Sequence, residues 1–287
     1  MHYLAASLGV YGGPAAEAPL VITVGDDSEP FDLRRANPWS RRYPIEWRWL
    51  DRALYRRFLY WGTRQQRFRY DYQADVVLFL DPDVLVVGPF VELVEDVART
   101  GSFTGITAHT TPVRDEFTWE RLFALARLGP PLMQCEHSGF GVMFNDAANR
   151  YCPPYFNLGV LACPASVGRA IGSVIMSELE TIFEYESFFR AQASLTLAIV
   201  RLGIPWQLMS LKYNFPNDPR FLARYRGEFE DKRLVHYLRK QQFDKEADFG
   251  TPAQIGALIN REGLNEVNRA FLDRLRPVHA RVLDDLA

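Results

Sequence analysis

A run of apolar residues that ends in two closely spaced carboxylates constrains this chain more than any other feature. Val76–Leu80 reads Val-Val-Leu-Phe-Leu and is followed by Asp81-Pro82-Asp83. An unbroken apolar run of this length is typical of a strand buried on both faces of a parallel sheet. Open α/β sheets bind ligands at the carboxyl ends of such strands. Two carboxylates at that edge, one residue apart, can hold a divalent cation beside a phosphate.

Composition limits the class of protein. The chain has 287 residues, 48% of them hydrophobic and 24% charged, with a net charge of -2, so nothing indicates a nucleic-acid partner. Cys135, Cys152 and Cys163 contain no Cys-x-x-Cys pair, which disfavours zinc ribbons and a disulfide framework. No apolar stretch approaches the roughly 18 residues that span a membrane, and the N-terminus has no signal-peptide pattern. We therefore expect a cytoplasmic enzyme.

The order of the predicted elements is that of an α/β domain with a helical tail. Helical spacing and stop signals predict helices over residues 2–10, 45–68, 89–99, 118–128, 166–184, 188–202 and from 252 to the end. Apolar runs predict strands over residues 20–24, 76–80, 103–108, 155–162 and 234–237, with 34–43 as a loop. Residues 138–144 are spaced by glycines and predict a loop or short strand near a ligand. We expect one domain over residues 1–250 and a helical extension over 251–287, which could support a homo-oligomer.

Five short motifs share their order and spacing with a known family. They are the Asp81-Pro-Asp83 strand end, Gly62-Thr-Arg64 upstream of it, Tyr155-Phe-Asn-Leu-Gly-Val160, Gln192 in Ala-Gln-Ala-Ser-Leu, and Leu234-Val-His-Tyr-Leu238. In this order they resemble the motifs of GT-A glycosyltransferases, most closely those of family 8. The resemblance covers residues 55 to 245. It implies a Rossmann-like GT-A fold, with a mixed and mostly parallel sheet, flanking helices and a nucleotide-diphosphate sugar, UDP-sugar first, as the donor.

The resemblance also implies a metal site. Asp81 would contact the metal and the donor ribose, while Asp83 and His236 would ligate the metal. Carboxylates are hard ligands that suit Mg²⁺ or Mn²⁺, and an imidazole shifts the preference toward Mn²⁺. Such a cation stabilises the nucleoside diphosphate that leaves when the sugar–oxygen bond breaks.

Further residues would bind the donor by the same resemblance. Arg64 would lie against the donor sugar or the phosphates, and Asn157 would hydrogen-bond a sugar hydroxyl. Gln192 would sit on the face of the reacting carbon opposite the leaving group, so Gln192 and Asp83 are the expected catalytic residues. The family's lysine and tryptophan after the late histidine are not matched, and Arg239 or Lys240 would replace them as the diphosphate clamp. Acceptor loops are expected over residues 109–149, for a glycan, a lipid or a natural product.

The chain departs from the family pattern at two other places. Ala191 stands where the family commonly has an aspartate, which removes a contact to the donor sugar. The first nucleotide-binding strand is also not found upstream of the first helix. Either the start is truncated, or residues 20–27 supply that edge and bring Gly25-Asp26-Asp27 toward the base. Since no acidic residue adjoins Gln192 as a general base, we expect retention of the anomeric configuration.

Other functions lack a partner residue in this sequence. A phosphotransferase of the haloacid-dehalogenase type needs Thr or Val where the chain has Leu85. It also needs a late acidic pair, and downstream of Asp83 an Asp-Asp pair occurs only at Asp284-Asp285, in the tail. A sugar nucleotidylyltransferase needs a glycine-rich phosphate loop that Gly12-Gly13-Pro14 does not supply. A non-catalytic sugar-binding or scaffold protein with the same fold stays open, because of Ala191 and the missing strand.

Overall fold

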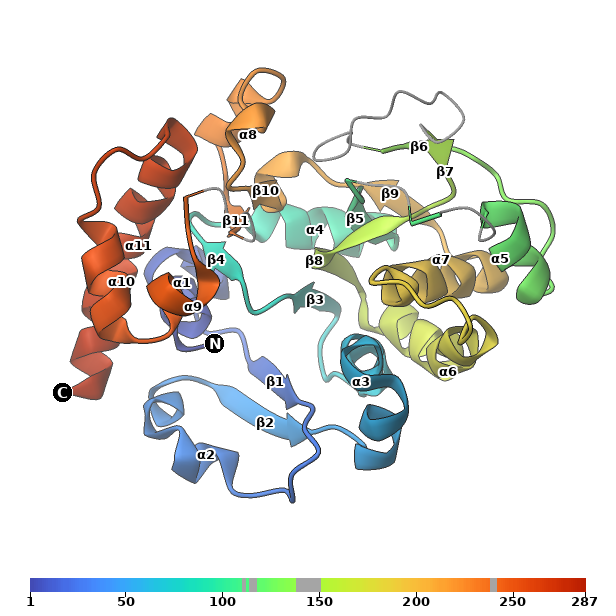
Figure 1. Cartoon of the computed structure of the whole chain (residues 1–287), viewed down its shortest axis with the longest axis horizontal. Helices are drawn as coiled ribbons and strands as arrows, with labels where there is room; N and C mark the ends of the chain where they lie inside the picture. The colour runs from blue at the N-terminus through green and yellow to red at the C-terminus, as the bar shows by residue number, and fades with distance from the viewer. Residues whose placement is uncertain (110–111, 114–117, 138–150, 238–241) are drawn as a thin grey trace.

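A four-stranded sheet forms the centre of the computed structural model, which describes residues 1–109, 112–113, 118–137, 151–237 and 242–287 (Figure 1). The strand order is β3-β8-β5-β9. The strands are β3 (Val76–Leu80), β8 (Phe156–Pro164), β5 (Phe103–Thr107) and β9 (Trp206–Leu208). β8 runs antiparallel to β3 and to β5, while β5 and β9 are parallel. The mixed α/β class is confirmed, although this sheet contains more antiparallel pairing than the mostly parallel arrangement that we expected.

Three smaller sheets accompany the central one. β10 (Phe215–Pro216) runs parallel to β11 (Leu234–His236), which pairs antiparallel with β4 (Val84–Val86). β1 (Leu20–Val24) and β2 (Ile45–Trp49) form a parallel pair of their own, and β6 (Cys135–Glu136) pairs with β7 (Tyr151–Cys152). Within the described residues β1 therefore joins no strand of the central sheet, so residues 20–27 do not supply its missing edge.

The strand that leads to Asp81 differs from the prediction. Among the strands that the structure describes, β3 lies at the edge of the sheet and pairs with β8 alone, in the antiparallel sense. Its residues alternate between buried and partly buried positions, with Val77 and Phe79 in one core cluster and Leu78 against another. The expected parallel pairing was therefore wrong, whereas both faces of the strand do pack against apolar clusters. An all-apolar run indicates that a strand is buried, but it does not show whether the strand pairs in the parallel or the antiparallel direction. That direction depends on the partner strand β8, some 80 residues later in the chain.

Helices cover both faces of the central sheet. Phe79, Leu161 and Cys163 belong to one apolar cluster with residues of α6 (Ala165–Thr181) and α7 (Arg190–Leu202). Val160 and Ala162 belong to the other, with α4 (Val91–Thr100) and α1 (His2–Tyr11). This alternation along β8 follows from the two-residue period of a strand. Other short helical segments include α5 (Trp119–Leu125), α8 (Arg226–Glu230), η1 (Gly13–Ala15), η3 (Arg67–Arg69), η5 (Leu211–Tyr213) and η6 (Pro219–Phe221).

The predicted long helix over residues 45–68 is divided in two. Ile45–Trp49 is strand β2, and the helix α3 (Arg52–Gln66) begins only after Asp51, whose carboxylate accepts a hydrogen bond from the Leu54 amide at 3.1 Å. Ile-Glu-Trp-Arg-Trp alternates apolar and polar residues, which is a strand pattern, and β1 provides the partner strand. The predicted loop over residues 34–43 instead contains the short turns α2 (Leu33–Ala36) and η2 (Pro38–Arg42).

The C-terminal helices pack on the body of the protein. They are α9 (Lys245–Phe249), α10 (Pro252–Ile259) and α11 (Glu266–Leu286). Phe271 and Val278 share an apolar cluster with Ala6 of α1 and Val235 of β11. Figure 1 shows α10 and α11 side by side beyond α1, on the β4–β11 side of the molecule. A division of the chain at residue 250 stays a prediction. Among the described residues, no helix is long and apolar enough to cross a membrane.

Candidate metal and donor site

The two carboxylates lie in the tight connection between two sheets. β3 ends at Leu80 in the central sheet, and β4 begins at Val84 in the sheet that contains β11. The Asp81 amide donates to the Gly159 carbonyl at 2.9 Å, which continues the β3–β8 pairing by one residue. The Val84 amide donates to the Asp81 carbonyl at 3.2 Å and closes a turn around Pro82. Asp81 and Asp83 therefore emerge from an ordered turn at the junction of the two sheets.

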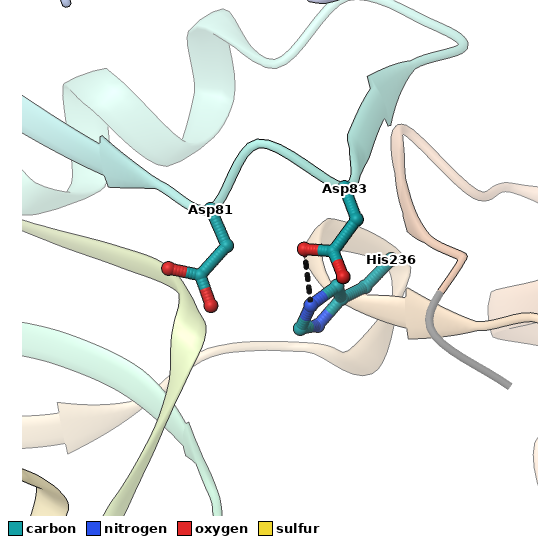
Figure 2. Close-up of side chains that lie close together, drawn as sticks. All are labelled: Asp81, Asp83 and His236. Atoms are coloured by element: carbon teal, nitrogen blue, oxygen red, sulfur yellow. Dashed lines mark ion pairs between the residues drawn. The ribbon is translucent and has the colours of Figure 1, made fainter. Parts of the chain in front are cut away.

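His236, the last residue of β11, completes a group of three potential metal ligands. One ligand atom from each of Asp81, Asp83 and His236 lies within 4.8 Å of the other two. Figure 2 shows the three side chains pointing toward one another, with the ion pair between Asp83 and His236 as a dashed line. The Nε2 atom of His236 lies 3.3 Å from Oδ1 of Asp83. Asp81 and His236 are only 6% and 5% exposed.

These three side chains fit a divalent cation. Two carboxylates and one imidazole are ligands that Mn²⁺ accepts, and Mg²⁺ takes the carboxylates. A cation bound by both carboxylates would also relieve their mutual repulsion. The register explains why the distant histidine reaches this point, because His236 lies directly opposite Val84, the residue after Asp83.

Two arginines flank the carboxylate of Asp81. Arg64 approaches Oδ2 and Arg67 approaches Oδ1, each with a terminal guanidinium nitrogen at 3.5 Å. Arg67 also donates to the Leu158 carbonyl at 3.2 Å. Burial is the main cause that lowers the pKa of the Arg67 guanidinium, and the charge of Asp81 opposes that shift. Arg67 was not among the predicted residues, although its place three residues after Arg64 could have indicated a shared helix face.

Asn157 lies on the other side of His236 and takes part in a chain of hydrogen bonds. Its side-chain oxygen accepts from the Gly159 amide at 2.9 Å and from the Asn214 amide group at 3.1 Å. The Asn214 oxygen in turn lies 3.2 Å from Nδ1 of His236. Asn214 was not predicted, and Gly159 was predicted only as part of the Tyr155–Val160 motif, because no local pattern in the sequence relates either residue to His236.

Gln192 lies beside the beginning of β8. Its amide group donates to the Phe156 carbonyl at 3.2 Å, and its oxygen accepts from the hydroxyl of Tyr155 at 3.2 Å. These bonds hold the buried Gln192 next to the residue that precedes Asn157. Its neighbour Ala191 is buried in the core, where its carbonyl accepts a hydrogen bond from Gln65.

Several other predicted residues lie outside the described part of the chain, and one predicted turn has other partners. Arg239, Lys240 and residues 138–144 lie outside the described residues, and so does most of the second half of the expected acceptor segment. Asp27, expected as part of a base-binding turn, instead forms ion pairs with Arg52 and Arg56 of α3. The structure thus brings together Arg64, Asp81, Asp83 and His236, with Asn157 on β8 and Gln192 of α7 hydrogen-bonded to the first residue of β8.

Two hollows on the described surface lie away from the three potential metal ligands. One, of about 460 Å³, lies between the end of α10 and the middle of α11, and is lined by Ile259, Arg269 and Arg276 among others. The other, of about 360 Å³, lies beside β2 and is lined by Phe31, Trp47 and Trp49 among others. None of the three potential metal ligands lines either hollow.

Comparison with known proteins identifies the fold. No family model matches the sequence, and no curated protein is similar to it. The galactosyltransferase LgtC, solved with donor and acceptor sugar analogues, matches over 98% of this chain and 91% of its own, with a TM-score of 0.54 and 14% identity. An active-site mutant of LgtC with glutamate in place of a glutamine has a TM-score of 0.52 at 15% identity. The apo form of the bifunctional glycosyltransferase WbbM has a TM-score of 0.55 at 11% identity, over 99% of this chain and 49% of its own. The chain therefore has the GT-A glycosyltransferase fold.

Proposed function

We propose that this protein is a metal-dependent glycosyltransferase. It would move a sugar from a nucleotide-diphosphate sugar, with UDP-sugar as the first candidate, to a hydroxyl group of an acceptor. The observation that carries the proposal is the convergence of Asp81, Asp83 and His236 at the junction of two sheets, in a chain with the GT-A fold. The donor and acceptor sugar analogues bound to LgtC support this class of substrate.

The charges around the site suit a diphosphate. Arg64 and Arg67 contribute two positive charges, and Asp81 and Asp83 contribute two negative charges, so the four together are neutral. A divalent cation raises the sum to +2 in surroundings that are largely buried, where charge interactions are stronger than in water. That excess matches an anionic diphosphate, and Arg64, the more exposed of the two arginines, is placed to contact it.

Each residue of the site has a separate role in this proposal. Asp81, Asp83 and His236 would hold Mn²⁺ or Mg²⁺, which supplies Lewis-acid stabilisation of the leaving diphosphate. Arg67 keeps Asp81 in place from the buried side. Asn157 would contact a hydroxyl group of the donor sugar. Arg239 or Lys240 would close on the diphosphate.

Gln192 is the proposed residue at the reacting carbon. Its amide is held by Tyr155 and Phe156, so its position is fixed before a donor binds. A neutral amide can stabilise positive charge that develops on the sugar, but it is a poor general base. We therefore propose transfer with retention of configuration. NMR assignment of the product anomer tests this point, and an inverted product would rule it out.

The central experiment measures nucleotide release and sugar transfer from a panel of nucleotide-diphosphate sugars with and without Mn²⁺. Asp83→Asn should abolish metal-dependent turnover while the folded CD spectrum is kept, because the amide cannot replace an anionic ligand. Asp71→Asn is a matched control, since Asp71 is an exposed carboxylate that pairs with Arg169. Equal turnover by wild type and Asp83→Asn would contradict the metal role of Asp83.

The competing function is a sugar-binding or scaffold protein without activity, and Ala191 is the observation that favours it. If no member of the donor panel is bound or turned over, with or without Mn²⁺, this second function replaces the first. Binding of a nucleotide sugar without turnover would support the same conclusion.

A further inference from the structure

A chain of hydrogen bonds runs from the backbone of β8 to the imidazole of His236. It begins at the Gly159 amide, passes through the side chains of Asn157 and Asn214, and ends at Nδ1 of His236. The three bonds measure 2.9, 3.1 and 3.2 Å. Asn214 is 1% exposed, so water does not compete for the hydrogen bonds of its side-chain amide.

The direction of every bond follows from its first donor. A backbone amide can only donate, so the group of Asn157 that faces Gly159 must be its oxygen. The group of Asn214 that faces this oxygen must then be its NH₂, which turns the oxygen of Asn214 toward His236. That oxygen can only accept, so Nδ1 of His236 must carry a hydrogen.

A neutral imidazole with a hydrogen on Nδ1 presents a lone pair on Nε2. This is the nitrogen that lies 3.3 Å from Oδ1 of Asp83, inside the group of potential metal ligands. The bonds therefore direct the lone pair of His236 toward the point that Asp81 and Asp83 also face.

We propose that Asn214 is a positioning residue that fixes the tautomer and the ring orientation of His236 for metal binding. This inference rests on the metal site of the proposed function. Because the same amide also holds the oxygen of Asn157, Asn214 links the metal ligand to the residue expected at the donor sugar. Partners of this kind typically change metal affinity about 10- to 100-fold when they are removed.

The test uses Mn²⁺ alone, without sugar. Asn214→Ala should bind Mn²⁺ about 10- to 100-fold more weakly than wild type in isothermal titration. Pulsed EPR of bound Mn²⁺ should show coupling to an imidazole nitrogen in wild type and lose it in Asn214→Ala. Loss of this coupling in a variant that still binds Mn²⁺ separates positioning of His236 from a general loss of structure.

Asn217→Ala is the matched control. Asn217 is also 1% exposed, and its amide donates to Asn268 at 3.1 Å instead of to a residue of the metal group. It should keep wild-type Mn²⁺ affinity and the nitrogen coupling. Asn214→Asp retains an acceptor for Nδ1 but cannot donate to Asn157, so it should recover the nitrogen coupling that Asn214→Ala loses.

The outcomes separate this inference from the function on which it rests. A wild-type protein that binds no Mn²⁺ would overturn both. If wild type binds Mn²⁺ and Asn214→Ala keeps the same Mn²⁺ affinity and the same nitrogen coupling, only the proposed role of Asn214 is overturned. If Asn214→Ala does not fold, Asn214→Asp decides, because loss of the nitrogen coupling in that variant would also overturn the inference.

Discussion

Replacing Gly159 by alanine places a methyl group where the imidazole of His236 lies. A Cβ atom built on Gly159 falls 2.2 Å from both Nδ1 and Cε1 of His236, and 2.8 Å from Oδ1 of Asn157. Ordinary contact begins at 3.4 Å, so the imidazole must move by 3.4 − 2.2 = 1.2 Å, or β8 must move by as much. Metal ligands tolerate errors of about 0.2 Å. Gly159→Ala should therefore remove His236 from the metal site.

The expected loss in Mn²⁺ affinity is about 100-fold, the upper end for a perturbed metal environment. Overpacking at a buried position costs about 1–3 kcal/mol of unfolding free energy, so the apoprotein should remain folded with a lower melting temperature. Isothermal titration with Mn²⁺ and thermal melts with and without Mn²⁺ measure the two effects separately. We expect Mn²⁺ to raise the melting temperature of wild type, and to raise that of the variant much less.

Gly227→Ala is the control for the glycine substitution itself. Gly227 lies in α8, and nothing is within 4 Å of a Cβ atom built there. This variant should keep wild-type Mn²⁺ binding. If Gly159→Ala binds Mn²⁺ as tightly as wild type does, the steric argument is refuted. Either His236 is not a ligand, or β8 moves to make room for the methyl group without displacing His236.

Three further predictions concern other parts of the site and the fold. Arg67→Met should lower the unfolding free energy by about 3 kcal/mol in urea, because it removes a buried charge that pairs with Asp81; a loss below about 1 kcal/mol would mean that the pair behaves like an exposed one. Gln192→Ala should lower kcat about 10²-fold and leave Mn²⁺ affinity unchanged, and a parallel loss of Mn²⁺ binding would indicate a structural role instead. A hydrogen bond from Arg261 holds the pKa of the Asp248 carboxyl below its usual range. The ionised Asp248 therefore stabilises the fold fully above the unfolded-state pKa of about 4, and this stabilisation is lost as the pH falls through the lower native pKa. Urea unfolding from pH 7 to pH 3 should thus show a steeper loss for wild type than for Asp248→Asn, and parallel curves would contradict this assignment.

Local patterns predicted most of the helices and strands but not their partners. The apolar spacing of residues 166–184 and 188–202 led to α6 and α7 with small shifts at the ends. Ile45–Trp49 was assigned to a helix because its aromatic residues continue into α3, although the alternation of these five residues fits the strand that forms. β1 decided between the two patterns, and β1 lies 25 residues earlier in the sequence.

The candidate site divides in the same way. Asp81, Asp83 and His236 were predicted together, and the structure brings them within 4.8 Å. Arg67 and Asn214 were not predicted, since an arginine at a helix end and an asparagine after Tyr213 are ordinary surface or turn residues by sequence alone. Their roles depend on which strand lies beside them after folding.

Residue types and their spacing were enough to predict the chemistry that this protein can offer: two carboxylates one residue apart, a late histidine and an arginine upstream, in a fixed order. These features can be recognised from residue types and from their spacing along the chain, without knowledge of the fold. Folding was needed to show that β3 pairs antiparallel at a sheet edge, that Arg67 is buried against Asp81, and that Asn214 connects Asn157 to His236. Strand pairing and side-chain hydrogen bonds join residues far apart in the chain, and their free energy depends on geometry that no local pattern contains.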